Sequence, residues 1–301
     1  MIAQIHFAGG CFWGAEHFFR QVDGVSDVLP GYANGRLPHP TYQQVYTDET
    51  GHAETVQVSY HPDRVSLQQL VRLFFAFIDP LSLNRQGEDA GTRYRTGVYY
   101  ADPAELPVIQ AVFQEESARL GAPLCTELLP LECFYPAEEY HRRYLDKHPD
   151  GYCHIPLKTF RYLRLYQDLR YLLGEEPDLT ARMANMAALL QERMRFFWTG
   201  FYRVEGEQLV LGPFQGPVAC YRIGYGKGVC GSAWKAQQTL VVPDVEAFPG
   251  HIACSSESRS EVVVPVFREG AVTAVLDIDS KELACFDPVD ARWLEMAVAL
   301  L

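Results

Sequence analysis

Residues 9–20 read Gly-Gly-Cys-Phe-Trp-Gly-Ala-Glu-His-Phe-Phe-Arg, and this stretch sets the expected architecture of the first half of the chain. A strand-like run at residues 3–8 leads into the glycine pair, and a helical pattern follows Cys11. The turn from strand to helix places the Cys11 thiol on the first helical turn, where unpaired N–H groups and the helix dipole favour a thiolate. A buried core cysteine is the commoner role of a lone thiol. The glycine pair and the surrounding motifs favour a nucleophile at Cys11 instead.

Length and charge limit the classes of function. A chain of 301 residues is expected to form two domains, here 1–157 and 158–301. Lys and Arg total 26 against 38 Asp and Glu, a net charge of −12 with no clustered basic face, which argues against nucleic acid and anionic membranes as partners. The N-terminus lacks the pattern of a signal peptide, and no run of about 18 apolar residues occurs. These features predict a cytoplasmic protein.

The eight cysteines are expected to be packing residues or redox thiols. Without an export signal they argue against a structural disulfide framework. No Cys-x-x-Cys occurs and the nine histidines are scattered, so we expect neither a metal site nor a cofactor. Cys125, Cys133 and Cys285 fall outside every motif, and we expect them to be structural or inert.

The hydrophobic pattern predicts an α+β fold. In the first half, strands are expected at 3–8 and 54–60, helices at 66–76, 103–120 and 137–147, and long functional loops at 30–41 and 84–93. The second half is expected to begin with a helical hairpin over 158–195, broken at 174–177. Five short strands should follow, with turns at Glu205-Gly206 and Glu269-Gly270 and a closing helix from Asp287; the strands are 198–204, 208–214, 239–242, 261–267 and 272–278. This pattern predicts a mixed sheet in the first domain and an antiparallel sheet flanked by helices in the second.

Four motifs of the first half form a recognisable set: Gly-Cys-Phe-Trp-Gly-Ala-Glu (10–16), Pro-Thr-Tyr (40–42), Thr-Gly-His-Ala-Glu (50–54) and the loop 84–95. Together with Phe-Tyr-Pro-Ala-Glu-Glu-Tyr-His (134–141) and Gly-Tyr-Cys (151–153), they resemble the methionine sulfoxide reductase A family over residues 1–157. The resemblance implies an α/β sandwich-like domain that reduces methionine-S-sulfoxide, protein-bound and free.

The chemistry of a sulfoxide explains these residue types. Attack by a thiolate on its sulfur requires protonation of, or a hydrogen bond to, its oxygen. Glu54, flanked by apolar residues, is expected to be a carboxylic acid whose pKa is raised by desolvation. Tyr42 and Tyr94 are phenols suited to holding the oxygen, and the resemblance assigns the same roles to all three. It also assigns Phe12 and Trp13 to the apolar wall around the substrate methyl group, and Asp89 to substrate orientation.

Attack on the sulfoxide leaves a sulfenic acid on Cys11, which condenses with a second thiol. Cys153 is the expected partner, because the family places a recycling cysteine in the same Gly-Tyr-Cys. The resulting disulfide requires an external dithiol, which implies thioredoxin as reductant.

The second half carries its own set of motifs, spread over residues 198–280. Trp-Thr-Gly-Phe-Tyr (198–202), the segments 211–220, 226–231 and 248–254, and Val-Leu-Asp-Ile-Asp-Ser (275–280) resemble the GAF-fold free methionine-R-sulfoxide reductase family. By that resemblance Cys254 is the nucleophile, and Cys220, or in second place Cys230, is the resolving thiol. A GAF domain that only binds ligands would not need this cysteine triplet.

The substrate site of the second half is expected to combine acids with aromatic walls. Strand alternation puts Asp277 and Asp279 on one face, beside Glu261 on a neighbouring strand. Converging acids require a cation or a shared proton, and the ammonium group of a free amino acid supplies the cation. Trp198 and Tyr202 would form the walls.

The predicted function is a bifunctional methionine sulfoxide reductase whose substrates are oxidised proteins and free methionine sulfoxide. The two halves would share a chain because oxidation of a thioether produces both epimers. The alternative is a methionine-S-sulfoxide reductase whose second half is a regulatory ligand or redox sensor.

Overall fold

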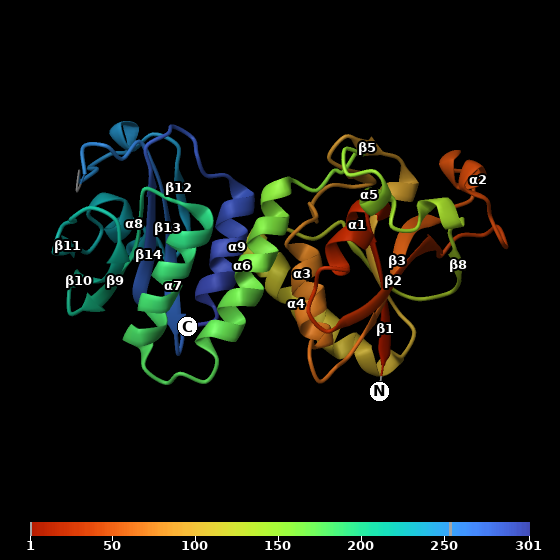
Figure 1. The fold of residues 1–301 in the computed structure, drawn as a ribbon, viewed down its shortest axis with the longest axis horizontal. Coiled ribbons are helices and arrows are strands. Elements are labelled where there is room, and N and C mark those ends of the chain that lie inside the picture. Colours follow the sequence, from red (N-terminus) through yellow and green to blue (C-terminus); the bar gives the residue numbers. More distant parts are fainter. Residues whose placement is uncertain (1, 253–254) are drawn as a thin grey trace. The chain divides into compact units, whose positions relative to one another are not determined.

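The computed structural model describes residues 2–252 and 255–301, and the chain divides into two compact units, residues 1–160 and 161–301. Each unit is built around one six-stranded sheet with helices packed on it (Figure 1). The sheet of the first unit is mixed and that of the second is antiparallel, so the predicted α+β class with these two sheet types is confirmed. No helix in the described part of the chain is long and apolar enough to cross a membrane.

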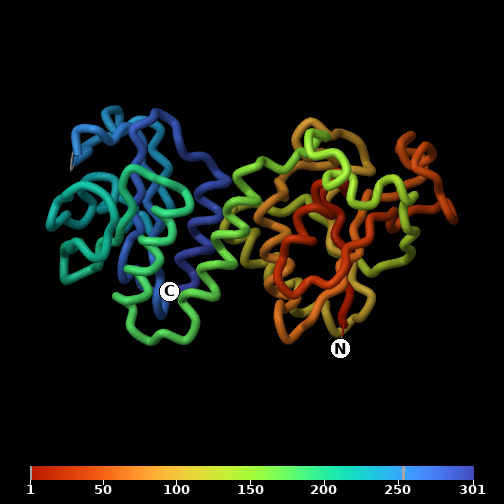
Figure 2. The backbone as a smooth tube through the Cα atoms, viewed as in Figure 1, coloured from red at the N-terminus to blue at the C-terminus, as the bar shows by residue number. Residues whose placement is uncertain are grey.

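The first sheet has the strand order β7-β6-β1-β3-β2-β8, with β6 and β7 parallel and the other neighbours antiparallel. Its strands are β1 (Ala3–Gly9), β2 (Val25–Ala33), β3 (Ala53–Tyr60), β6 (Thr96–Tyr100), β7 (Glu127–Pro130) and β8 (Phe134–Pro136). Strand β1 lies inside the sheet between β6 and β3, and the tube in Figure 2 shows the chain turning back from its end. The expected strands at 3–8 and 54–60 are therefore present and central.

The helices of the first unit are α1 (Phe12–Phe19), α2 (Tyr42–Tyr46), α3 (Leu67–Phe75), α4 (Leu106–Leu120) and α5 (Tyr144–Lys147), with short 3-10 turns η1 (Thr92–Tyr94), η2 (Pro103–Glu105) and η3 (Glu139–His141). Helix α3 begins where the Ser66 side chain accepts a hydrogen bond from the Gln69 N–H. Its buried face brings Phe74 against Phe7, and Phe7 stacks in turn on Phe19 of α1. This aromatic core fixes α1, and with it Cys11, on the sheet.

The prediction of one helix at 137–147 is wrong. The chain instead forms η3 and the single turn of α5, separated by Arg143 in the left-handed region at φ 51°. Both carboxylate oxygens of buried Glu16 accept a hydrogen bond from the Arg143 backbone N–H at 2.9 Å. This tertiary contact breaks the helical pattern.

The long loops at 30–41 and 84–93 also contain structure that the sequence did not predict. Strand β2 continues through Pro30, which pairs with Val56, and ends only at Ala33. The second loop holds a two-stranded ribbon, β4 (Arg85–Gln86) and β5 (Asp89–Ala90), and the start of η1. Proline is uncommon inside a sheet, and this is why the pattern favoured a loop from Pro30 onward.

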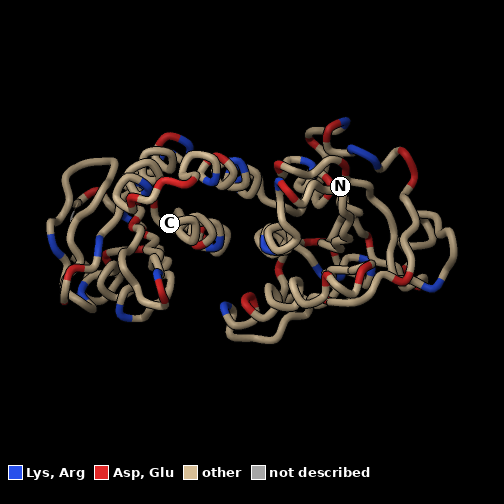
Figure 3. Tube along the Cα trace, turned by 90° about the horizontal axis from the view of Figure 1, so that it is seen from below, with Lys and Arg blue, Asp and Glu red and all other residues tan. Residues whose placement is uncertain are grey.

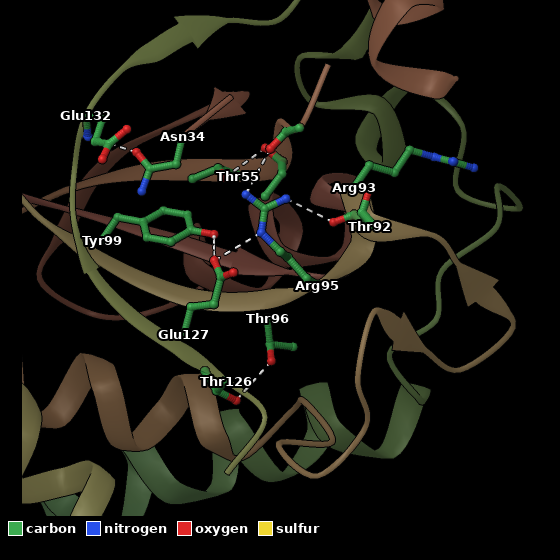
Figure 4. A network of polar contacts seen from close by, with 12 residues as sticks. Asn34, Thr55, Thr92, Arg93, Arg95, Thr96, Tyr99, Thr126, Glu127 and Glu132 are labelled. Carbon is green, nitrogen blue, oxygen red and sulfur yellow. Dashed lines mark hydrogen bonds and ion pairs between the residues drawn. The ribbon is translucent and has the colours of Figure 1, made fainter. Parts of the chain in front are cut away.

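A polar network connects the end of the second loop to the sheet (Figure 4). Arg95 donates from Nε to Glu127, which also accepts the Tyr99 hydroxyl at 2.7 Å. The remaining Arg95 nitrogens donate to the carbonyls of Thr92 and Gly51. The Arg95 guanidinium therefore ties η1, which carries Tyr94, to the segment that leads into β3, the strand that carries Glu54.

The second sheet has the order β11-β10-β9-β14-β13-β12 and is antiparallel throughout. Its strands are β9 (Trp198–Glu205), β10 (Gln208–Gln215), β11 (Arg222–Gly224), β12 (Leu240–Val242), β13 (Ser260–Arg268) and β14 (Ala271–Ser280). The five expected strands are all present. Both predicted turns are confirmed, with Gly206 and Gly270 at φ 63° and 79°.

The helices of this unit are α6 (Leu157–Leu173), α7 (Leu179–Met194), α8 (Gly228–Ala236) and α9 (Pro288–Val298), with the 3-10 turn η4 (Val245–Ala247). The helical hairpin α6–α7 and the closing helix are confirmed. Asp287 caps α9 by accepting hydrogen bonds from the N–H groups of Val289 and Asp290. Helix α8 was not predicted, because its glycine-rich first turn has low helix propensity.

Charged residues of both signs are interspersed along the described chain, as Figure 3 shows. Lys and Arg occur in short stretches of the tube, with Asp and Glu close by along the chain.

Candidate functional site

Cys11 lies at the N-cap of α1, directly after the central strand β1. Gly10 has φ +78°, and a Cβ atom there would lie 2.7 Å from Cβ of Gln86, so this turn requires glycine. The Cys11 side chain is 6% exposed. The expected strand-to-helix position of the thiol is therefore present, in a nearly closed site.

The protonation state expected for Cys11 is wrong for this structure. Burial raises the pKa of the thiol well above its usual value, and the neighbouring Glu54 raises it further. The Trp13 backbone amide lowers the pKa, but by less than burial raises it. The helix terminus is present as expected, but burial opposes the thiolate more strongly than the helix terminus favours it.

Glu54 is completely buried beside Cys11. It lies on β3, is 1% exposed, and its Oε2 accepts a hydrogen bond from the Phe12 backbone N–H at 3.0 Å. Burial raises the pKa of the Glu54 carboxyl to about 8. Near neutral pH the group is thus mostly a carboxylic acid. Its hydrogen bond to Phe12, the residue after Cys11, holds it next to the nucleophile.

Tyr42 and Tyr94 lie at the same site on different elements. Tyr42 is half-buried at the start of α2, and Tyr94 is buried in η1. Burial raises the pKa of both phenols, that of Tyr42 to about 12, and both also interact electrostatically with Glu54 and Cys11. Both phenols therefore stay protonated as hydrogen-bond donors.

An aromatic cluster packs against Tyr42, and His141 is at its centre. The Trp13 Nε1–H donates to His141 Nδ1 at 3.0 Å, and the His141 ring lies 5.0 Å from that of Phe12 and 4.5 Å from that of Tyr42. Tyr144 stacks on Trp13 at 3.8 Å. Phe12 and Trp13 thus form an apolar wall. The sequence did not indicate that His141, the last residue of the motif 134–141, anchors Trp13.

Two further carboxylates position the tyrosines, and neither was predicted. Glu138 accepts hydrogen bonds from the Tyr42 backbone N–H and the Tyr32 hydroxyl, at 2.8 and 2.7 Å. Asp48 pairs with Arg93 at 2.5 Å, and the guanidinium lies over the ring of Tyr94 at 4.4 Å. In the sequence, the only signal for Glu138 and Asp48 is that each lies close to a predicted site residue or motif.

Asp89 and Cys153 complete the first site. Cys153 packs against Gly14 of α1, where an added Cβ atom would lie 3.2 Å from the Cys153 Sγ. Cys153 and Asp89 both interact electrostatically with Cys11. Burial raises the pKa of the Cys153 thiol. His154 lies with Nδ1 3.9 Å from Asp89 Oδ2. The structure thus brings Cys11, Glu54, Tyr42, Tyr94, Asp89 and Cys153 together.

A pocket in the other unit gathers the acids predicted there. Glu261 on β13 and Asp277 and Asp279 on β14 line it, together with Trp198, Tyr202 and Cys230. Burial and mutual repulsion raise the pKa values of Glu261 and Asp277 well above the usual range, and burial raises that of Asp279 to about 6. The expected convergence of three acids and two aromatic walls is present.

The three cysteines of this half have different environments. Cys230 on α8 is a free, buried thiol, whose Sγ donates to Glu261 Oε1 at 3.8 Å. Cys220 is disulfide-bonded, and its carbonyl accepts the Tyr202 hydroxyl at 3.1 Å. Cys254, the expected nucleophile, lies outside the described residues.

The remaining cysteines lie apart from both sites. Cys125 and Cys133 donate weakly from Sγ to the carbonyls of Leu81 and Gly35, and Cys285 is exposed. All three are free thiols that can serve as controls.

Two models of known protein families match different parts of the chain. The family model described as peptide methionine sulfoxide reductase matches residues 3–169, and a GAF domain model matches residues 176–301. A peptide methionine sulfoxide reductase MsrA of Clostridium acetobutylicum is 50% identical over 158 residues, which cover 52% of this chain and 98% of that protein.

Two solved structures are also similar, one to each part. A methionine sulfoxide reductase A of Corynebacterium diphtheriae is 34% identical with a TM-score of 0.47, covering 52% of this chain and 83% of its own. A free methionine-R-sulfoxide reductase from Neisseria meningitidis, solved with its substrate, is 49% identical with a TM-score of 0.46, covering 46% and 84%.

Proposed function

Because the chain belongs to the peptide methionine sulfoxide reductase family and carries a GAF domain over residues 176–301, we propose that each half reduces one epimer of methionine sulfoxide. As a member of this family the protein is an oxidoreductase that reduces methionine sulfoxide, and its first half acts on the S epimer. The proposal adds the residue roles, the reductant and the activity of the second half. In this proposal the domains 1–157 and 158–301 carry the two activities.

The first half acts through Cys11 with Glu54 as its proton donor. The single observation that supports this assignment is the buried carboxyl of Glu54, held by the Phe12 N–H beside the thiol, with its pKa raised to about 8. Glu54, Tyr42 and Tyr94 donate hydrogen bonds to the sulfoxide oxygen, which increases the electrophilicity of the sulfur. Phe12 and Trp13 hold the methyl group and Asp89 orients the substrate. Both protein-bound and free S-sulfoxide reach this site in our proposal.

The electron balance of the reaction requires a second thiol. Attack by Cys11 transfers the oxygen to its sulfur, so that the thioether leaves and Cys11 becomes a sulfenic acid, oxidised by two electrons. Cys153 then attacks this sulfur, water leaves, and a Cys11–Cys153 disulfide forms. An external dithiol, which we propose to be thioredoxin, reduces the disulfide and restores both thiols.

Replacement of the recycling thiol tests this sequence of steps. Cys153→Ser is expected to allow one turnover per protein molecule and to reduce thioredoxin-dependent turnover at least about 100-fold, because the Cys11 sulfenic acid has no partner thiol. Rapid-quench product counting and dimedone labelling of Cys11 measure the two effects. Cys125→Ser and Cys133→Ser are the matched controls. Undiminished steady-state turnover in Cys153→Ser would assign the recycling role to one of those two thiols.

The second half is proposed to reduce free methionine-R-sulfoxide. Three acids with raised pKa values, of which Glu261 and Asp277 are buried, are present in a pocket with no Lys or Arg among its described lining residues. An ammonium group of a free amino acid would compensate ionised acids, and a protonated acid would donate to the sulfoxide oxygen. Trp198 and Tyr202, which line this pocket, would enclose the thioether of the substrate.

The cysteine roles in the second half follow from the same proposal. Cys254 is the nucleophile and Cys220 the preferred resolving thiol, with Cys230 as the other candidate. The disulfide-bonded state of Cys220 and the free state of Cys230 support this order.

Loss of one thiol distinguishes catalysis from sensing in the second half. Cys254→Ser is expected to lower free R-sulfoxide reduction by at least about 1000-fold and to leave S-sulfoxide reduction unchanged, because a serine hydroxyl is a far weaker nucleophile at neutral pH. Stereospecific assays on both free epimers measure this, with Cys285→Ser as the matched control. Wild-type protein without R activity would instead support the regulatory ligand or redox sensor.

A further inference from the structure

Three potential metal ligands converge at the pocket of the second unit. The Sγ atom of Cys230 and one carboxylate oxygen each of Glu261 and Asp277 lie within 4.8 Å of one another, on α8, β13 and β14. In tetrahedral zinc sites, ligand atoms at about 2.0–2.3 Å from the ion lie roughly 3.5 Å apart. Cys230 Sγ and Glu261 Oε1 are 3.8 Å apart, so small side-chain rotations bring this set to ligand geometry.

An unsatisfied acceptor provides a second, independent observation. Asp277 is 7% exposed, lies on a central strand, and its buried Oδ1 has no hydrogen-bond partner. Buried carboxylate oxygens almost always have a partner, so an unpaired one on a side chain that lies beside a thiol and a second carboxylate marks a position for a ligand. Within the described residues, these three side chains are the group of potential ligands whose donor atoms converge in this way.

We propose that Cys230, Glu261 and Asp277 form a binding site for a zinc-type divalent cation. The thiol selects a borderline-soft ion over Mg²⁺ or Ca²⁺, which prefer ligand sets composed only of oxygen. Three protein ligands leave a fourth coordination position directed into the pocket. The sequence predicts no metal site, because ligands at 230, 261 and 277 have no recognisable spacing, whereas the fold brings them together.

Binding at this site exchanges protons for the cation. Cys230 must lose its thiol proton, and any protonated carboxyl among Glu261 and Asp277 must lose its own. The other titratable groups that line the pocket are Asp279 on β14, Tyr202 on β9 and His251 before β13. Because burial keeps the three ligands protonated, affinity should increase with pH and each bound ion should release at least one proton.

Cobalt(II) substitution on the reduced, full-length protein tests the site directly. We expect a near-ultraviolet thiolate-to-cobalt charge-transfer band in the wild type and in Cys285→Ser, and at least about a tenfold loss of affinity in Cys230→Ser and Asp277→Asn. Zinc titration calorimetry in two buffers of different ionisation enthalpy should show proton release that disappears in Cys230→Ser. Thermal unfolding of both variants verifies that they are folded, and zinc should raise the Tm of the wild type but not of Cys230→Ser.

The proposal is overturned if the wild type gives no charge-transfer band, or if Cys230→Ser or Asp277→Asn binds with unchanged affinity. These measurements do not use catalysis, so they stand even if the second half reduces nothing. A further result rests on the proposed function: the ion would occupy the substrate position, so zinc should inhibit free R-sulfoxide reduction and leave peptide S-sulfoxide reduction within twofold.

Discussion

Cys11→Ser is expected to abolish reduction of peptide-bound methionine-S-sulfoxide, with a loss of at least about 1000-fold. Serine fits the same buried space at the N-cap of α1, so the fold is retained, but its hydroxyl does not form the sulfenic acid that carries the transferred oxygen. A stereospecific assay on a peptide with a single S-sulfoxide measures the loss, and circular dichroism verifies the fold.

Two controls make this result specific to the thiol. Cys125→Ser changes an exposed cysteine of the same unit and should retain full activity. In the Cys11→Ser protein, the second half should still reduce free R-sulfoxide. Retained S-sulfoxide turnover in Cys11→Ser would exclude this residue as the nucleophile.

Much of the fold could be predicted because local patterns agreed with tertiary structure. In the second sheet, β9 is joined to β10 and β13 to β14 by Glu-Gly turns, and this signal is local in the sequence. Strand β2 could not be recognised, because Pro30 is tolerated there only through pairing in three dimensions. The helix expected at 137–147 is interrupted by a hydrogen bond to Glu16, a residue more than 120 positions earlier in the chain.

The site shows the same division between local and tertiary information. The motif resemblance identified Cys11, Glu54 and the two tyrosines, and the fold places them together. The protonation of Cys11 could not be inferred from its helix position, because the outcome depends on how much water the rest of the fold excludes. The anchoring role of His141 likewise depends on a ring contact with Trp13, far from it in sequence.

The raised pKa of Glu54 has a consequence for stability. A carboxyl with a pKa of about 8 in the folded protein and 4.5 when unfolded takes up a proton on folding at pH 7. The contribution of this group to the free energy of unfolding is fully present below pH 4.5 and is lost as the pH rises through about 8. Near pH 7 the free energy of unfolding is lower than at acidic pH by an amount on the order of 3 kcal/mol. Glu54 therefore destabilises the folded protein at neutral pH, although it lies beside the nucleophile Cys11.

Glu54→Gln is therefore expected to change activity and stability in opposite directions. Glutamine still accepts the Phe12 N–H and fills the same space, but it has no acidic proton to donate, so the S-sulfoxide reduction rate should fall by about 100- to 10,000-fold. At pH 7 the free energy of unfolding should increase, because folding no longer requires proton uptake at this position.

The pH dependence provides the sharpest test of Glu54 as the acid. In the wild type, single-turnover kcat/KM for S-sulfoxide should fall as the pH rises through about 8, where Glu54 ionises, and this decrease should be absent in Glu54→Gln. Glu49→Gln, which removes an exposed carboxylate five residues earlier, should retain the wild-type rate and pH profile. A wild-type profile in Glu54→Gln would mean that the proton comes from another group, and Tyr42 and Tyr94 would then be the donors to replace. Loss of the rate without loss of the alkaline decrease would instead make Glu54 a positioning residue for Phe12 and Cys11.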